Sequence, residues 1–292
     1  MPPNVKPDTV RFDPEQKRRG AALARSQYAT LPRRLAKHGR AGHCRARQQG
    51  SGALVKKFRT AILAVALALA MDAGQPASAQ AVDLQLVLAV DTSGSVSEQR
   101  FQLQKQGYAA AFRSPRLLQA IVSGSTRAIA VTMTQWTGPV LQIQVVPWMR
   151  IDSEASMHAF ADAVDKAPRQ LFGGGTSISG AIDHAMTLFP KAGFHGARRV
   201  IDVSGDGANN RGRPADAARD DAVRDGATIN GLPILALEPY LDRYYWNSVV
   251  GGPGAFVITA ESYETFADAV LKKLVIEIAG KPATTVATLA GE

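Results

Sequence analysis

Five oxygen-bearing side chains stand in three loops that border apolar stretches of the sequence. They are Asp91, Ser93, Ser95, Thr176 and Asp206. Two carboxylates and three hydroxyls, with no histidine or cysteine among them, suit a hard divalent cation that prefers octahedral oxygen coordination. The sequence therefore predicts a Mg²⁺ site, with Mn²⁺ or Ca²⁺ as alternatives, and it disfavours zinc.

The first of these loops follows the stretch around which the rest of the chain is organised. Residues 84–90 are apolar except for Gln85, a pattern typical of a central strand that is buried on both faces of a parallel sheet. Asp91, Ser93 and Ser95 then stand at alternate positions. Ligands of open parallel sheets gather at the carboxyl ends of the strands, so we expect the functional site at that edge.

The other two loops are expected at the same edge because of the elements around them. Thr176 ends the glycine-rich loop 173–176 before a helix, and Asp206 follows a strand at 198–204. Further strands are expected at 127–136, 140–151, 232–237 and 255–260, and helices at 97–113, 153–166, 178–189, 216–225 and 263–279. A short turn between the first two of these strands predicts an antiparallel hairpin. The predicted fold class is α/β, with a doubly wound, mostly parallel central sheet, one antiparallel edge strand, and helices on both faces.

Positive charge is concentrated in the first 79 residues. They hold 15 Lys and Arg against 4 Asp and Glu, whereas residues 80–292 hold 19 against 21. The high overall charge therefore gives no support to nucleic-acid binding. Residues 54–79 have the layout of a signal peptide, with a basic patch, an apolar run at 61–70 and small residues before a cleavage point after Ala79. We therefore expect an exported protein, either periplasmic or secreted.

The leader and the tail lie outside the predicted domain, which spans residues 80–280. Residues 1–53 are Arg-rich and aperiodic, which indicates a disordered extension or a mis-called start, and they contain the only cysteine, Cys44. The apolar run at 61–70 is well short of the roughly 20 residues that span a bilayer, so no stable membrane span is expected after cleavage. Residues 281–292 are expected to form a flexible tail.

Three short motifs resemble the metal-ion-dependent adhesion site (MIDAS) of von Willebrand factor A (vWA)-type domains. They are D-T-S-G-S at 91–95, G-G-T at 174–176 and D-G at 206–207, and the resemblance covers residues 82–279. It implies that the hydroxyls of Ser93, Ser95 and Thr176 bind the metal, and that Asp91 and Asp206 act directly or through water. It also implies one open coordination position for a partner's Asp or Glu. Among such domains, the chain resembles exported bacterial members of unassigned function, which implies a binding protein and not an enzyme.

Each proposed ligand also has a structural alternative. Ser95 with Glu98 fits a capping box, so its hydroxyl could serve the start of a helix. Thr176 could likewise be only a helix cap. Asp202 would share a strand face with Asp206 if the strand stayed extended, so it is a second candidate for the carboxylate.

An enzyme alternative rests on a faint similarity to haloacid-dehalogenase-type phosphotransferases. Residues 91–95 and 205–210 echo their aspartyl-phosphate and Mg²⁺ motifs, and Asp91 would then be a nucleophile. Thr92, Ser93 and Asn210 depart from the motifs at positions where that superfamily carries a lysine or a second acid. The binding interpretation is therefore preferred.

Aromatic side chains near the predicted site indicate a surface for a protein ligand. Tyr240, Tyr244, Tyr245 and Trp246 follow the expected strand at 232–237, and Trp136 stands at the hairpin. Aromatic residues are favoured anchors in protein interfaces. The same spacing is equally consistent with a short helix that packs through its tyrosines.

Overall fold

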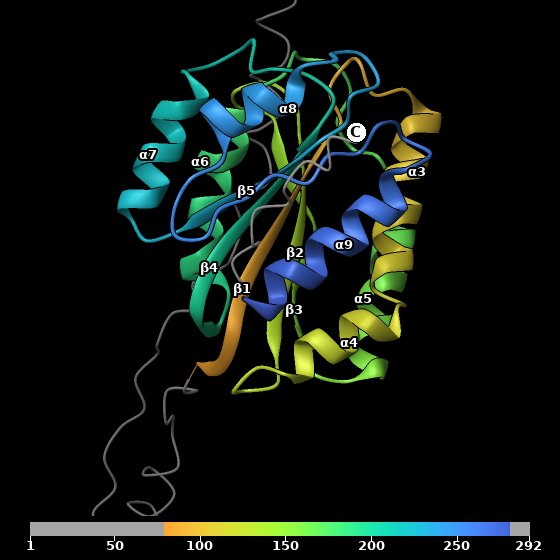
Figure 1. Ribbon diagram of the computed structural model, residues 1–292, viewed down its shortest axis with the longest axis vertical. Helices are drawn as coiled ribbons and strands as arrows, with labels where there is room; N and C mark the ends of the chain where they lie inside the picture. The colour runs from red at the N-terminus through yellow and green to blue at the C-terminus, as the bar shows by residue number, and fades with distance from the viewer. Residues whose placement is uncertain (1–78, 281–292) are drawn as a thin grey trace, which may run out of the picture. The chain divides into compact units, whose positions relative to one another are not determined.

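The computed structural model describes residues 79–280, which fold around a five-stranded sheet with the order β3-β2-β1-β4-β5 (Figure 1). The strands are β1 (Gln80–Asp91), β2 (Ile129–Trp136), β3 (Gln142–Ile151), β4 (Phe194–Gly205) and β5 (Thr228–Pro233). Strand β3 lies at one edge and is antiparallel to β2, whereas the other pairs are parallel. The prediction of a mostly parallel sheet with one antiparallel edge strand is confirmed.

Helices cover both faces of this sheet (Figure 1). They are α3 (Glu98–Ala111), α4 (Pro115–Val122), α5 (Glu154–Lys166), α6 (Ile178–Leu188), α7 (Ala215–Arg224), α8 (Leu241–Tyr244) and α9 (Phe266–Ala279). Leu84, Leu86 and Leu88 of β1 belong to the apolar cluster beneath α3, α4, α5 and α9, and Val87 and Ala89 belong to the cluster beneath α6 and α7. Successive side chains of a strand point to opposite faces, so β1 supplies both cores.

Some predicted elements are wrong in position. A regular strand was expected at 232–237, but β5 begins four residues earlier, at Thr228. The strand expected at 255–260 is reduced to isolated bridges, in which Val257 pairs with Gly231 and Ala260 with Ile234. Helix α4 was not predicted, and it starts at Pro115, whose fixed φ suits the first helical position.

The start of β5 was missed because it carries a buried polar side chain. Asn230 is only 3 % exposed, and its Nδ2 donates to Glu277 Oε1 of α9 at 2.7 Å. Its Oδ1 accepts from the backbone N–H of Phe256 at 3.0 Å. The amide is therefore satisfied inside the protein, which allows a polar residue in a strand that an apolar pattern does not reveal.

A buried charged cluster connects α9 to β4. Lys273 is fully buried, and its Nζ lies 2.7 Å from Asp202 Oδ1 and 3.3 Å from Glu277 Oε1. Burial raises the pKa of Asp202 to about 7, against the opposing effect of Lys273. Because two carboxylates share one ammonium group here, removal of Lys273 would leave both of them buried without a positive charge.

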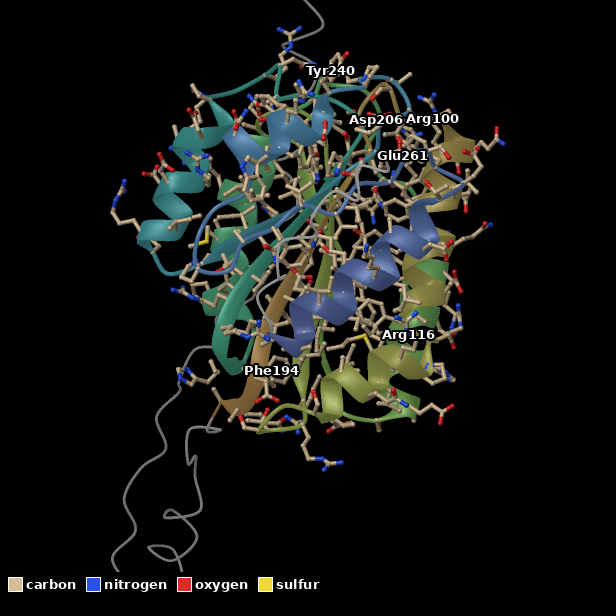
Figure 2. The ribbon with its side chains drawn as sticks, in the orientation of Figure 1. Arg100, Arg116, Phe194, Asp206, Tyr240 and Glu261 are labelled. Atoms are coloured by element: carbon tan, nitrogen blue, oxygen red, sulfur yellow. The ribbon has the colours of Figure 1, made fainter. Side chains whose placement is uncertain are left out.

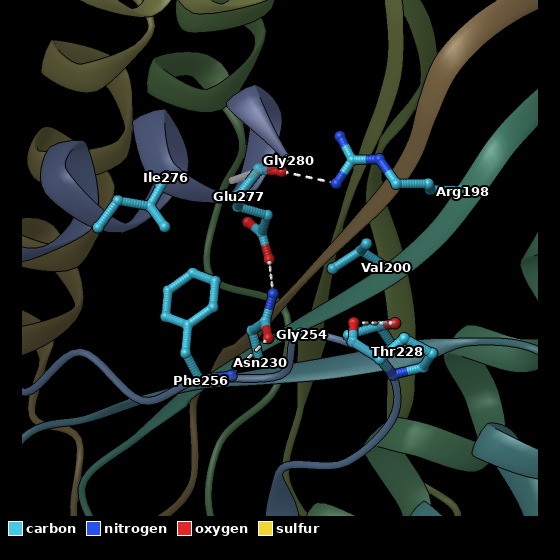
Figure 3. Close-up of a pocket in the computed structure, with 10 residues that line it drawn as sticks. Arg198, Val200, Thr228, Asn230, Gly254, Phe256, Ile276, Glu277 and Gly280 are labelled. Atoms are coloured by element: carbon cyan, nitrogen blue, oxygen red, sulfur yellow. Dashed lines mark hydrogen bonds between the residues drawn. The ribbon is translucent and has the colours of Figure 1, made fainter. Parts of the chain in front are cut away.

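A cavity of about 300 Å³ opens beside this cluster, between α9, β4 and β5 (Figure 3). At its rim, the guanidinium of Arg198 donates to the backbone carbonyls of Glu277 and Ile278, each at 2.9 Å. These carbonyls are among the last of α9 and have no partners within the helix, so Arg198 supplies the hydrogen-bond donors that they lack.

No helix among residues 79–280 combines the length and the apolar character that a membrane crossing requires. The predicted extension at 1–53, the signal peptide at 54–79 except its last residue, and the tail at 281–292 lie outside the described residues.

Candidate metal centre

Asp91 and Asp206 leave the sheet side by side at the carboxyl ends of two parallel strands. Val90 of β1 lies opposite Ser204 of β4, so the next residues of both strands emerge at the same edge. A Cβ atom placed on Gly205 would lie 2.8 Å from Asp91 Oδ2, which shows how closely the end of β4 approaches this carboxylate. Figure 2 shows Asp206 at this edge, beside Arg100.

The two serines connect these carboxylates. Ser93 donates its backbone N–H to Asp91 Oδ1 at 2.7 Å, and its Oγ lies 3.1 Å from Ser95 Oγ. Ser95 Oγ in turn donates to Asp206 Oδ1 at 2.5 Å. The loop after β1 and the loop after β4 are therefore joined through side-chain oxygens, as a shared ligand would require.

Thr176 is held against the same place by the loop after β4. Its backbone N–H donates to Asn210 Oδ1 at 2.9 Å, and its carbonyl accepts from the N–H of Asn210 at 2.9 Å. A Cβ atom on Gly207 would lie 3.8 Å from Thr176 Oγ1. The hydroxyl of Thr176 thus lies beside the segment that carries Asp206, and the structure brings all five predicted residues to one edge.

Neither Ser95 nor Thr176 caps a helix. Helix α3 is capped by Ser97, whose side chain accepts from the N–H of Arg100 at 3.3 Å. Helix α6 is capped by Ser177, whose Oγ accepts from the N–H of Gly180 at 3.2 Å. The capping alternatives are therefore wrong, and the two hydroxyls remain available for a ligand.

Asp202 is not part of this arrangement. It lies in the buried cluster with Lys273, beneath α9. Its ion pair with a lysine explains its presence in the strand, as a core residue and not as a metal ligand. Asp206 is therefore the carboxylate that β4 brings to the site.

Two residues that were not predicted from the sequence, Tyr263 and Arg100, hold the side chain of Asp206 in place. Tyr263 Oη donates to Asp206 Oδ2 at 2.8 Å, and burial together with the charge of Asp206 raises the pKa of Tyr263, which keeps the hydroxyl protonated. Arg100 Nη1 lies 3.7 Å from the same Oδ2 and donates to the carbonyl of Ser95 at 2.8 Å. Its guanidinium also lies 5.3 Å from the centre of the Tyr263 ring. Nothing in the local sequence marks these two residues, because the contacts join distant segments.

The electrostatics of the site fit a cation. Asp91 is fully buried, and its Oδ2 has no hydrogen-bond partner among the described residues. Burial, and then the charge of Asp206, raise the pKa of Asp91 to about 7. A divalent cation would supply both the missing partner and the missing positive charge. Residues 79–280 hold no group of three or more His, Cys, Asp or Glu placed to share a metal.

Metal affinity is expected to depend on pH through Asp91. A cation competes with the proton that the raised pKa keeps on this carboxyl, so affinity should fall about tenfold per pH unit below pH 7 and level off above it. Calorimetric titration of Mn²⁺ at several values between pH 5.5 and 8.5 measures this profile. A constant affinity over that range would show that metal binding displaces no proton from a buried carboxyl.

The aromatic residues that were predicted as a ligand surface divide into two groups. Trp136 and Tyr245 are fully buried in the apolar cluster beneath α6 and α7, so their assignment to a surface is wrong. Tyr244 is half-buried, and its Oη accepts from the N–H of Asn209 at 3.3 Å. Tyr240 and Trp246 are 69 % and 61 % exposed. The segment packs as a short helix and still presents two aromatic rings to solvent.

A family model described as a protein of unknown function, DUF1194, matches residues 81–282. The chain belongs to the DUF1194 family. A search of curated proteins found no match to this DUF1194 chain.

Several solved structures resemble the DUF1194 domain in fold. Proximal thread matrix protein 1 from the mussel byssus is 16 % identical with a TM-score of 0.51, over 68 % of this chain and 49 % of that chain. The vWF domain of the type V pili tip protein Mfa5 from Porphyromonas gingivalis is 9 % identical with a TM-score of 0.46, over 68 % of this chain and 96 % of that chain. The DUF1194 chain spans about half the length of the mussel protein, of which a further structure has a zinc-occupied MIDAS motif (15 % identity, TM-score 0.48, 69 % of this chain and 47 % of that chain). The DUF1194 domain has the α/β fold of vWA-type domains.

Proposed function

We propose that residues 80–280 form an exported protein-binding domain that engages an acidic residue of a partner through a divalent cation. The ligands are Asp91, Ser93, Ser95, Thr176 and Asp206, and the domain catalyses no reaction of its own. The observation that carries the proposal is the pair of buried carboxylates connected through Ser93, which bonds to Asp91, and the Ser95 hydroxyl, which bonds to Asp206, with one oxygen of Asp91 left without a partner among the described residues.

The donor set explains how such a site would recognise an acid. Three of its five donors are neutral hydroxyls, so a bound cation would stay electrophilic and attract a further carboxylate. Hydrogen bonds within the protein orient both carboxylates in the absence of a cation. The backbone N–H of Ser93 fixes one oxygen of Asp91, and the hydroxyl of Tyr263 fixes one oxygen of Asp206.

Mg²⁺ is the cation that we propose, with Mn²⁺ or Ca²⁺ as alternatives. All five donors are oxygens, which favours hard cations over zinc. The zinc in the MIDAS motif of the mussel protein makes zinc the cation against which this preference should be tested.

The partner surface that we propose includes exposed apolar side chains beside the candidate metal centre. Phe172, 67 % exposed, lies against the guanidinium of Arg169, with 4.8 Å between the guanidinium carbon and the ring centre. Arg169 Nη2 donates to the carbonyl of Ser93 at 3.3 Å, which connects Phe172 to the loop after β1. Together with Tyr240 and Trp246, Phe172 favours a protein or peptide whose acidic residue is flanked by apolar ones.

The proposed location and partner class rest on the charge distribution. The signal-peptide layout at 54–79 supports export to the periplasm or beyond. Residues 80–292 carry 19 basic and 21 acidic residues, which supports a protein partner and not a nucleic acid.

Calorimetric titration of Mg²⁺, Mn²⁺ and Zn²⁺ into the protein tests the proposed site. A variant with Ser93→Ala and Thr176→Ala is expected to lose at least about 100-fold in affinity, because it lacks two direct ligands and loss of outer partners alone costs 10–100-fold. The matched control is Ser123→Ala with Thr187→Ala, which removes two exposed hydroxyls that bond only to nearby helix carbonyls. Binding to the site variant as tight as to the control would overturn the assignment.

The enzyme alternative gains no support from the geometry. Asp91 has no exposed surface, and Ser93 holds one of its oxygens. A nucleophile must be reached by the phosphoryl group that it attacks. A metal-dependent acyl phosphate on Asp91 after incubation with acetyl phosphate would contradict the binding proposal.

A further inference from the structure

Arg100 places a guanidinium beside the candidate metal centre, and the domain uses only part of it. Its Nη1 donates to the carbonyl of Ser95 at 2.8 Å and lies 3.7 Å from Asp206 Oδ2. Nε and Nη2 donate no hydrogen bond to another group of residues 79–280, and the side chain is 31 % exposed. Figure 2 shows Arg100 beside Asp206 at this edge of the sheet. Most of the N–H donors of this guanidinium therefore face no acceptor within the described residues.

The guanidinium is held in a defined position. Its carbon lies 5.3 Å from the centre of the Tyr263 ring, and the hydroxyl of this tyrosine donates to Asp206 at 2.8 Å. Tyr263 is itself buried, so the ring is a fixed support. A side chain that is already ordered loses little further freedom when it binds a ligand. The remaining donors of Arg100 are thus pre-organised beside the proposed cation.

The charge of Arg100 is unfavourable for both of the structures that it adjoins. Arg100 lies in the first turn of α3, where its backbone N–H bonds to the cap Ser97, and a cation is disfavoured at this end of a helix. It would also repel a divalent cation on the two proposed ligands that it contacts. The charge of Asp206 offsets these costs only until a cation neutralises it. Once a metal is bound, an anion is the group that complements Arg100.

We propose that Arg100 binds the acidic residue of the partner together with the metal, with one carboxylate oxygen on the cation and the other on the guanidinium. This inference rests on the proposed function of the site and names a second point of contact for the acid. An acid that reaches a cation held by Ser95 and Asp206 comes next to the guanidinium, because Arg100 contacts both residues. The planar fork of a guanidinium matches a carboxylate in geometry and forms charge-assisted hydrogen bonds with it.

Mn²⁺ and acetate are the probes for this inference. Calorimetry measures the affinity for Mn²⁺, and the relaxivity of water protons measures acetate binding, because acetate displaces a water from the bound ion. Arg100→Gln is expected to bind Mn²⁺ about three- to tenfold more tightly, since a repelling charge is removed. The Mn²⁺-loaded variant is expected to bind acetate about tenfold more weakly, since the acid loses its second contact. A merely structural role of Arg100 would weaken both.

Two further variants complete the test. Arg100→Lys keeps the charge and loses the fork, so Mn²⁺ should bind with unchanged affinity and acetate about threefold more weakly. The control is Arg116→Gln, which changes an exposed arginine of α4 that Figure 2 shows well away from Asp206.

The outcomes separate this inference from the metal site itself. If Mn²⁺ binds to the unmodified protein, and Arg100→Gln either matches the control in acetate affinity or binds Mn²⁺ more weakly, the inference fails while the metal site stands. If acetate leaves the relaxivity of the Mn²⁺-loaded unmodified protein unchanged, the metal has no open position, and both the proposed recognition of an acid and the inference are wrong. If the unmodified protein shows no saturable Mn²⁺ binding, the metal site fails and the inference fails with it.

Discussion

Replacing Asp91 with asparagine is expected to weaken metal binding by at least about 100-fold and to stabilise the metal-free protein. The first effect follows from the loss of a buried carboxylate ligand. The second follows from its environment, since burial and Asp206 raise the pKa of Asp91 from 3.8 to about 7. Each pKa unit corresponds to about 1.4 kcal/mol, so asparagine should increase the free energy of unfolding by up to about 4 kcal/mol at pH 8.

The pH dependence of this stabilisation gives a second check. The penalty for the ionised carboxylate is absent below pH 3.8, grows between pH 3.8 and 7, and is complete above pH 7. Urea unfolding with EDTA, at pH 4.5 and at pH 8, should therefore show a larger gain at pH 8. Asp225→Asn, which changes an exposed aspartate, serves as the control. An Asp91→Asn protein that binds Mg²⁺ like the control would remove Asp91 from the ligand set.

Replacing Lys273 with methionine is expected to lower the free energy of unfolding by about 3–5 kcal/mol. Lys273 is fully buried between Asp202 and Glu277, so its removal leaves two carboxylates in the core without a cation. The loss should be greater at pH 8 than at pH 5. Burial already raises the pKa of Asp202 to about 7, and the carboxyl can avoid its charge only by taking up a proton. Urea unfolding at the two pH values measures both effects.

A triple variant separates the charge of this cluster from its packing. Asp202→Asn, Lys273→Met and Glu277→Gln together remove all three charges and nearly keep the volume, so most of the lost stability should return. Agreement of the triple variant with Lys273→Met would show that packing of the lysine stem, and not charge, holds α9 to the sheet. A loss below about 1 kcal/mol in the single variant would show that the cluster contributes little.

The sequence predicts β1 and the loops of the candidate site well because their signals are local. The apolar run before Asp91 and the spacing of Asp91, Ser93 and Ser95 depend only on neighbouring residues. Parallel pairing then requires the loops after β1 and β4 to meet. The proximity of Asp91 and Asp206 thus follows from the topology of the sheet.

Other features were not predictable because they depend on contacts between distant segments. Asn230 breaks the apolar pattern of β5, and only its bonds to Glu277 and Phe256 explain why it is buried. The sequence pattern places Tyr263 in the closing helix, whereas α9 begins three residues later and the hydroxyl of Tyr263 donates to Asp206.

Two hydroxyl residues precede each of the helices α3 and α6. In each pair one residue, Ser97 or Ser177, caps the first turn of the helix, and the other, Ser95 or Thr176, is a proposed metal ligand. The anchoring of these helix ends is thus independent of whether a cation is bound. Under the proposed function, the scaffold would therefore keep its shape when one metal replaces another and when no metal is bound.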